Sequence, residues 1–269
     1  MKNKIGIFVI GIMAAMAFVS CDPVEDRQEM KGAVTMADID RIVTVTQEVR
    51  NGKKSNFFSF NSDGLLALSS FTHSLGTTTG TGTGGKNIQC FLFPGQADIL
   101  FTALNSDGTK LTKTFNFTID EAFDVAPQWD YITASSSKTW VFAGKGGDEG
   151  VWYAMTDNSD YTAVWWNAGG TCCPPSDVNG RMVFEAQGLV VTIYSSPNDA
   201  SPKKGTFSFN SDFTQLTFKD GVNALGASGD QANNGVYKVI NLDKNELFLH
   251  VGGGMPNGTG WVWRFKPQD

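Results

Sequence analysis

Residues 111–119 read Leu-Thr-Lys-Thr-Phe-Asn-Phe-Thr-Ile, and this segment gives the clearest indication of the fold class. Apolar and polar side chains alternate along it, which is the pattern of a β-strand with one buried face. The turn sequence Asn105-Ser106-Asp107-Gly108 precedes it, and the apolar run 97–104 precedes the turn. Two strand-like runs joined by an Asn/Asp/Gly turn predict a β-hairpin.

Similar runs recur along most of the chain, separated by turns that contain Gly, Asn, Asp and Pro. They are rich in Phe, Val, Thr and Trp, which favour strands, and no stretch has the period of an amphipathic helix of three or more turns. The other runs lie at 42–45, 57–60, 138–142, 150–154, 164–168, 181–184, 189–194, 205–209, 215–218, 236–240, 246–250 and 260–265. The sequence therefore predicts an all-β protein.

The strand pattern breaks once, between Glu121 and Pro127, and a second series of strands starts near Trp129. A chain of 269 residues is long enough for two ordinary domains. We therefore expect two β-sandwich domains, the first at 34–127 and the second, jelly-roll-like, at 128–269.

The first 20 residues have the features of a secretory signal peptide. Lys2 and Lys4 precede an apolar stretch from Ile5 to Val19, which is too short for a flanked spanning helix. Phe18-Val19-Ser20-Cys21 resembles a bacterial lipobox, which implies that the mature protein begins at a lipid-modified Cys21 and is anchored to a membrane. The alternative is an ordinary cleaved signal followed by an incidental cysteine.

An acidic segment follows Cys21 and extends to residue 33. Its start, Asp22-Pro23-Val24-Glu25-Asp26, resembles the export signal that Bacteroidota place behind the lipid-bearing cysteine, which implies an outer-membrane protein exposed at the cell surface. Two alternatives stay open: a solvated linker, or inner-membrane retention, which an Asp after the cysteine signals in enteric bacteria.

The charge and the few histidines exclude several classes of function. The chain has 27 acidic and 21 basic residues, and removal of residues 1–20 leaves 19 basic ones, so the net charge changes from −6 to −8. Such a chain lacks the basic surface that nucleic acids require. Its only histidines, His73 and His250, exclude a multi-histidine metal site, and we expect no cofactor. We interpret the recurring Asn-Ser-Asp runs as turns rather than calcium ligands.

Three cysteines remain once Cys21 carries lipid. Cys172 and Cys173 are adjacent, so they either form a vicinal disulfide or stay, with Cys90, as three unpaired thiols.

Two family resemblances support this organisation. Residues 34–122, with Phe93-Pro94-Gly95, the turn at 105–108 and the alternating last strand, resemble a PKD-type, immunoglobulin-like domain, although the Trp-Asp-Phe-Gly-Asp segment of PKD domains is missing. The second region has a Lys-Thr-Trp strand, a Gly-rich segment, a Trp-Trp pair and a closing Trp-x-Trp-x-Phe strand. It resembles the C-terminal domain of Bacteroidota surface glycan-binding lipoproteins. The resemblance implies a polysaccharide or oligosaccharide ligand and work with an outer-membrane glycan transporter.

Tryptophans in the second region are the candidate binding residues. Sugar rings stack on flat aromatic side chains, while Asp, Asn and Gln bind the hydroxyl groups. Trp140 lies in a dense apolar run, and Trp261, Trp263 and Phe265 share one strand face, so we expect these four in the core. Consecutive aromatic residues in a strand point to opposite faces. In each of the pairs Trp152-Tyr153 and Trp165-Trp166, one ring should therefore lie outside the core. The candidate glycan-binding residues are these four, together with the nearby polar residues Asp148 and Asn167, which could bind hydroxyl groups.

The leading function is non-catalytic binding of a polysaccharide or oligosaccharide for uptake. A structural or adhesive surface lipoprotein is the alternative. A glycoside hydrolase is a lesser alternative, since it needs two carboxylates that flank the sugar bond and the sequence has no recognisable catalytic motif.

Overall fold

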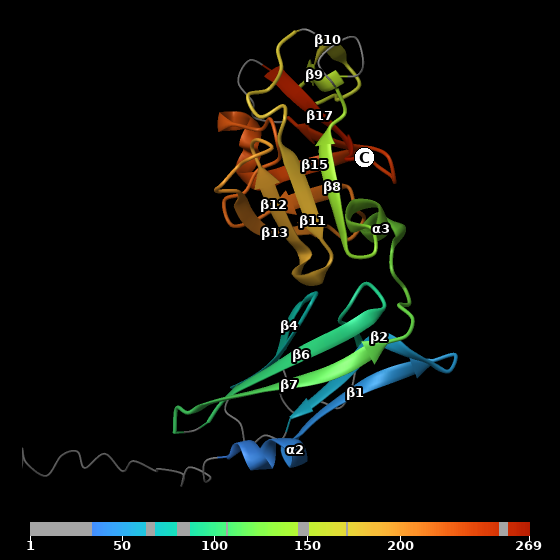
Figure 1. Ribbon diagram of the computed structural model, residues 1–269, viewed down its shortest axis with the longest axis vertical. Helices are drawn as coiled ribbons and strands as arrows, with labels where there is room; N and C mark the ends of the chain where they lie inside the picture. Colours follow the sequence, from blue (N-terminus) through green and yellow to red (C-terminus); the bar gives the residue numbers. More distant parts are fainter. Residues whose placement is uncertain are drawn as a thin grey trace, which may run out of the picture.

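The computed structural model describes residues 34–62, 68–79, 87–105, 107–144, 151–170, 172–252 and 258–269. They form two lobes, placed end to end and joined by residues 120–126 (Figure 1). Antiparallel sheets make up both lobes, so the all-β prediction is confirmed. The predicted signal peptide, Cys21 and the acidic tether lie outside the described residues.

The N-terminal lobe consists of two antiparallel sheets, with strand orders β1-β2-β5 and β4-β3-β6-β7. The hairpin β6–β7 pairs Leu104 with Lys110, and Gly108 donates a backbone hydrogen bond to Asn105, which confirms the predicted hairpin. The strands are β1 (Val43–Arg50), β2 (Lys53–Ser62), β3 (Leu68–His73), β4 (Gly76–Thr79), β5 (Ile88–Gln89), β6 (Gly95–Leu104) and β7 (Lys110–Ile119).

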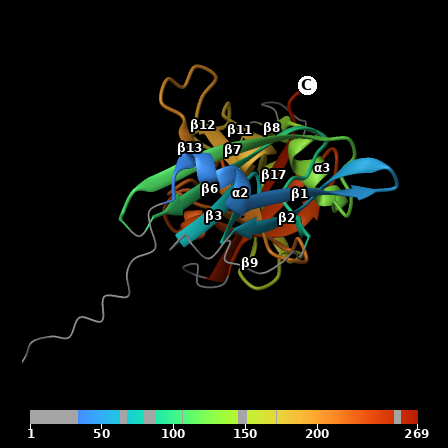
Figure 2. The ribbon, with the colours of Figure 1, turned by 90° about the horizontal axis from the view of Figure 1, so that it is seen from below.

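Alternating side chains of the two sheets form the core of this lobe. Ile99 and Phe101 of β6 are fully buried, as are Phe58 of β2 and Phe71 of β3, and the rings of Phe71 and Phe101 are 5.1 Å apart. The short helices η1 (Met36–Asp38) and α2 (Ile39–Ile42) lie at the lower end of the lobe (Figures 1 and 2). Both sheets contribute to this one core, so we call the lobe the sandwich; its Ig- and PKD-like fold stays a prediction.

The C-terminal lobe is a closed eight-stranded antiparallel barrel with strand order β8-β11-β12-β13-β14-β15-β16-β17, closed by pairing of β17 with β8. The barrel strands are β8 (Ser137–Phe142), β11 (Arg181–Glu185), β12 (Val190–Tyr194), β13 (Lys203–Phe209), β14 (Gln215–Phe218), β15 (Val236–Leu242), β16 (Leu247–Val251) and β17 (Thr259–Pro267). Two further strands, β9 (Val151–Asp157) and β10 (Val164–Gly169), extend the sheet beyond β17.

The jelly-roll-like sandwich predicted for 128–269 is therefore wrong in topology. From β11 to β17 each barrel strand pairs with the next one in the chain, and Phe265 of β17 lies opposite Phe142 of β8. Pairing between the two ends of one sheet makes a barrel, whereas a jelly roll has two packed sheets.

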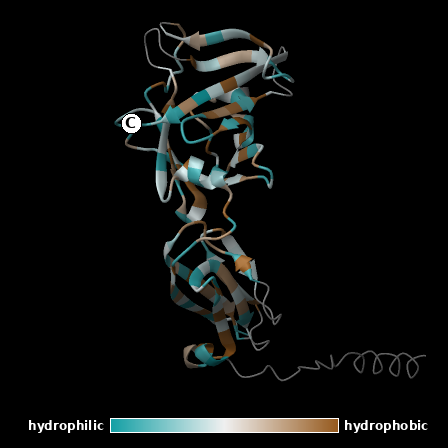
Figure 3. Ribbon diagram, turned by 90° about the vertical axis from the view of Figure 1, so that its right-hand side faces the viewer, coloured by the Kyte–Doolittle hydropathy of each residue, from teal (hydrophilic) through white to brown (hydrophobic). Residues whose placement is uncertain are grey.

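Large side chains fill the barrel, and a helix closes its lower end. Trp140, predicted to be core, is fully buried, and its indole Nε1 donates to the Ile132 carbonyl at 3.0 Å. Ile132 belongs to α3 (Pro127–Thr133), whose Trp129 packs edge-on against Phe209 of β13. Figure 3 shows hydrophobic and hydrophilic residues mixed along the strands of both lobes, as alternation requires. The turns η2 (Gln187–Leu189) and η3 (Gly229–Gly235) connect barrel strands.

Each lobe has its own cluster of buried apolar side chains. The predicted domain boundary after residue 127 falls at the start of α3. Independent folding of the two parts stays a prediction.

Candidate functional site: an aromatic face at the barrel rim

The candidate site lies on strands that project beyond the barrel rim. The last residues of β17 pair with β8 and close the barrel, whereas its first residues, from Thr259 to Trp263, pair with β9. Strand β10 pairs with the other edge of β9. Strands β10, β9 and the first half of β17 therefore form a three-stranded extension, seen at the top of Figure 1.

One side of this extension carries a cluster of aromatic rings. Met155 of β9 lies between Trp166 of β10 and Trp261 of β17, and Tyr153 lies opposite Trp263. Residues directly opposite each other in a sheet point to the same side, so these five side chains share one face. We call Tyr153, Trp166 and Trp261 the aromatic face.

Ring contacts hold the aromatic face together. The Tyr153 ring centroid is 5.9 Å from that of Trp166, 5.2 Å from that of Trp261 and 4.9 Å from that of Trp263. Trp261 and Trp263 are stacked, with an interplanar angle of 13°. These separations lie in the range of favourable aromatic pairs.

Burial decreases along the cluster from the barrel outward. Trp263 is only 2% exposed and belongs to the barrel core, whereas Tyr153, Trp166 and Trp261 are half-buried and pack against that core. The three outer rings are therefore held in place by the barrel core on one side and accessible to solvent on the other. A rigid stacking surface needs both properties.

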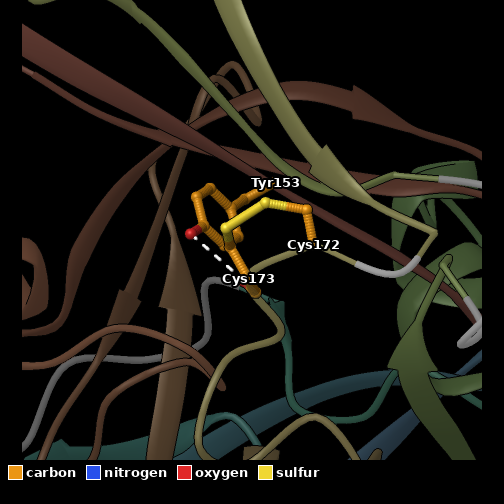
Figure 4. Close-up of a disulfide and its surroundings, with 3 residues drawn as sticks. All are labelled: Tyr153, Cys172 and Cys173. Atoms are coloured by element: carbon orange, nitrogen blue, oxygen red, sulfur yellow. Dashed lines mark hydrogen bonds between the residues drawn. A yellow bond between two sulfur atoms is a disulfide. The ribbon is translucent and has the colours of Figure 1, made fainter.

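A vicinal disulfide borders the aromatic face. Cys172 and Cys173 are bonded to each other, and the Tyr153 hydroxyl donates to the Cys173 carbonyl at 3.4 Å (Figure 4). Burial raises the pKa of the Tyr153 hydroxyl, so it keeps its proton at neutral pH. Of the two alternatives that the sequence left open, the bridge is the one present. Cys90 is a free, buried thiol, and burial raises its pKa to about 12.

Trp152 does not belong to the aromatic face, which corrects the prediction. It is 2% exposed and alternates with Tyr153 along β9, so it points to the other side of the strand. There it packs against Gly144, where an added Cβ would lie 2.5 Å from its ring. Trp152 also lines a cavity of about 470 Å³ with Phe142 and Val178.

The other predicted site residues differ in where their side chains lie. Trp166 and Tyr153 lie together on the aromatic face, as described. Trp165 is the extra residue of a β-bulge in β10 and is 58% exposed. Asn167 is exposed and lies opposite Ala154, so it points away from the aromatic face. Asp148 lies outside the described residues.

Trp261 is the site residue that the sequence reasoning missed. Its spacing to Trp263 and Phe265 correctly indicates one shared strand face, and the latter two are buried. Trp261, however, lies on the part of β17 that pairs with β9 rather than β8. Because that part extends past the end of β8, the same face is core at Phe265 and accessible at Trp261.

The described residues hold no group of three His, Cys, Asp or Glu side chains suited to a metal ion. The part-buried Asp177 accepts hydrogen bonds at both carboxylate oxygens from the Gly226 amide, at 3.0 and 2.9 Å. Burial raises the pKa of this carboxyl group. Gly226 in turn packs against the Trp263 ring, so Asp177 fixes a turn that supports the aromatic cluster. No helix in the described ranges has the length and apolar character needed to cross a membrane.

Comparisons with known proteins find similar chains among solved structures. No family model matches the chain, and no curated protein matches it. Among solved structures, the chain is similar to the lipoprotein BT2262 from Bacteroides thetaiotaomicron, with 14% sequence identity and a TM-score of 0.23. The similarity covers 83% of this chain and 99% of that protein.

Proposed function

We propose that this protein is a non-catalytic surface lipoprotein whose barrel lobe binds a polysaccharide or oligosaccharide on the aromatic face. The observation that carries the proposal is the set of three half-buried rings, Tyr153, Trp166 and Trp261, on one side of a strand extension. Accessible aromatic clusters are uncommon on soluble proteins and usually mark binding surfaces.

The chemistry of the aromatic face suits a sugar better than a purely apolar ligand. One face of a sugar ring consists of C–H groups, which stack on an indole or phenol ring, while its hydroxyl groups need hydrogen-bond partners. The Tyr153 hydroxyl and the partly exposed indole rings combine both properties. Contacts between the rings keep them in place before a ligand arrives, which lowers the entropy lost on binding.

The proposed location rests on residues outside the described part of the chain. Cys21 within its lipobox-like sequence supports a lipid anchor, and the acidic segment 22–33 supports exposure at the outer membrane. In this arrangement the N-terminal sandwich, a PKD/Ig-like domain in our proposal, is a spacer that holds the barrel away from the membrane. A glycan captured there is passed to an outer-membrane transporter.

The location is tested in cells. Cys21→Ala should release the protein from the membrane fraction, and proteinase K added to intact cells should digest the wild-type protein. Membrane attachment combined with full protection from the protease would contradict surface exposure.

The binding function is tested with the soluble chain 22–269, which contains every described residue. A glycan microarray identifies a ligand, and calorimetry then compares the wild type with Trp166→Ala and Trp261→Ala. Loss of one stacking ring should weaken binding by roughly 1–2 kcal/mol, or about tenfold, by analogy with interface aromatics.

Tyr194→Ala is the matched control, because Tyr194 is a half-buried aromatic residue on β12, away from the extension. It should leave affinity unchanged. If no glycan binds, or if folded Trp166→Ala and Trp261→Ala proteins bind like the control, the aromatic face is not a glycan site and the structural or adhesive alternative takes its place.

A further inference from the structure

A separate hollow of about 430 Å³ lies on the outer wall of the barrel. Three neighbouring strands form its floor, since Gln215 of β14 lies opposite Lys238 of β15, and Lys238 lies opposite His250 of β16. The adjacent residues Tyr237 and Leu249 are fully buried inside the barrel. Because side chains alternate along a strand, the floor residues point outward.

The loop between β9 and β10 forms one wall of this hollow through Asn158 and Ser159. It packs closely against Gly252, the residue after β16, because a Cβ added there would collide with the Asn158 carbonyl oxygen. Asn210 and Thr214, from the turn between β13 and β14, form a second wall. The close approach at Gly252 gives the hollow a defined shape.

Hydrogen bonds within the wall turns fix their polar groups. The Ser159 amide donates to Asp157 at 2.9 Å, the Thr162 amide to Asp160 at 2.8 Å and the Gln215 amide to the Asn210 side chain at 2.8 Å. The two carboxylates are thus engaged in their own turns, and neither is among the described residues that line the hollow. The lining consists mainly of amide and hydroxyl groups.

One positive charge stands at the floor. Lys238 Nζ lies 4.6 Å from the centroid of the Tyr161 ring, and the His250 ring lies 6.1 Å from that ring. Burial and, to a smaller extent, the charge of Lys238 lower the pKa of His250, so its imidazole is neutral at pH 7. Lys238 is therefore the single cation among the described lining residues at neutral pH.

We propose that this hollow binds an acidic sugar residue, whose carboxylate or sulfate lies beside Lys238 and whose hydroxyl groups bind the surrounding side-chain amides and hydroxyls. A lysine ammonium provides a compact charge for either anion, and the volume is within the range of small-molecule sites. The hollow is separate from the aromatic face, so this inference goes beyond the proposed function, and either site can exist without the other.

Calorimetry with the soluble chain 22–269 tests this site with three probes of similar size: trigalacturonate, a sulfated galactose oligosaccharide and neutral maltotriose. The wild type should bind at least one acidic probe more tightly than maltotriose, and the two acidic probes distinguish a carboxylate from a sulfate ligand. Lys238→Met keeps the length of the side chain and removes its charge. It should weaken acidic binding by about twofold to fivefold, the size expected for an exposed ion pair.

Lys204→Met is the matched control, because Lys204 is an exposed lysine of β13 that does not line the hollow. It should bind the acidic probe like the wild type. Absence of acidic binding, equal binding of maltotriose, or an equal effect of Lys238→Met and Lys204→Met would overturn the inference. None of these results bears on the aromatic face, which is tested through Trp166→Ala and Trp261→Ala.

Discussion

The two lobes use their aromatic residues in different ways. In the sandwich, Phe58, Phe71 and Phe101 are fully buried between two sheets. All seven tryptophans lie at or after residue 129, and in the barrel extension Trp166 and Trp261 are half-buried. Inner-face residues of a sandwich pack against the opposite sheet. The first residues of β17, in contrast, lie beyond the part of the strand that pairs with β8, and the side chain of Trp261 is only half-buried there. The burial of an aromatic side chain therefore depends on its position along the strand relative to the neighbouring strands, and not on residue type alone.

The largest expected effect comes from removing one core ring in each lobe. Trp140→Ala and Phe101→Ala should each lower the free energy of unfolding by about 3–5 kcal/mol, because each leaves a cavity. Since every tryptophan belongs to the barrel lobe, tryptophan fluorescence during urea unfolding reports on that lobe. Trp140→Ala should shift this transition and Phe101→Ala should leave it in place. A shift of equal size in both variants would show that the lobes unfold as one unit.

A second pair of variants separates burial from exposure within one hairpin. Trp152→Ala should destabilise the barrel by about 3–5 kcal/mol, since Trp152 is 2% exposed. Trp165→Ala should change stability by less than about 0.5 kcal/mol, since Trp165 is 58% exposed. Thermal and urea unfolding measure both. Equal losses of stability would mean that Trp165 is also packed, and our account of the bulge would be wrong.

A smaller effect should appear with pH, because each lobe has one histidine withdrawn from solvent: His73 is half-buried and His250 is buried. Burial lowers the pKa of His73 in the sandwich and of His250 in the barrel from the ordinary value of 6.5. The unfolded chain then binds the proton more readily, so stability is complete above pH 6.5 and decreases as the pH falls below it. The fluorescence-detected midpoint should drop between pH 7.5 and 5.5 in the wild type and less in His250→Gln. His73→Gln should retain the full drop; an equal drop in all three proteins would contradict the assignment.

The smallest expected effect is that of removing the sandwich. The linker joins lobes with separate buried clusters, and domains of this kind usually fold alone. Fragment 126–269 should therefore unfold cooperatively at the same urea midpoint as the barrel of the longer chain. A fragment that fails to fold would show that the sandwich completes the barrel core.

The sequence was sufficient for local structure but not for barrel closure. Alternation identified the strands of the β6–β7 hairpin, and the dense apolar run at 138–142 identified Trp140 as core. The pairing of β17 with β8 joins residues more than 120 positions apart, and no local pattern distinguishes a closed barrel from a jelly roll. The rim, and with it the exposure of Trp261, depends on that closure.

Consecutive aromatic residues set a similar limit. Trp152 and Tyr153 had to point to opposite sides of their strand, and Trp165 and Trp166 had to differ in the same way. The sequence could not say which side is core, because both residues of each pair are large and apolar. Tyr153 is on the aromatic face because Trp263, its neighbour across the sheet, anchors that side to the barrel, and Trp166 shares that side through Tyr153 and Met155 of β9.

In our proposal the glycan contacts the aromatic face and not the barrel core. Indole N–H signals of ¹⁵N-labelled protein, followed by NMR while a microarray-identified glycan is added, test this directly. We expect shifts for Trp166 and Trp261 and none for Trp140, whose Nε1 donates to the Ile132 carbonyl inside the barrel. Saturating glycan that leaves the Trp166 and Trp261 signals unmoved would contradict it.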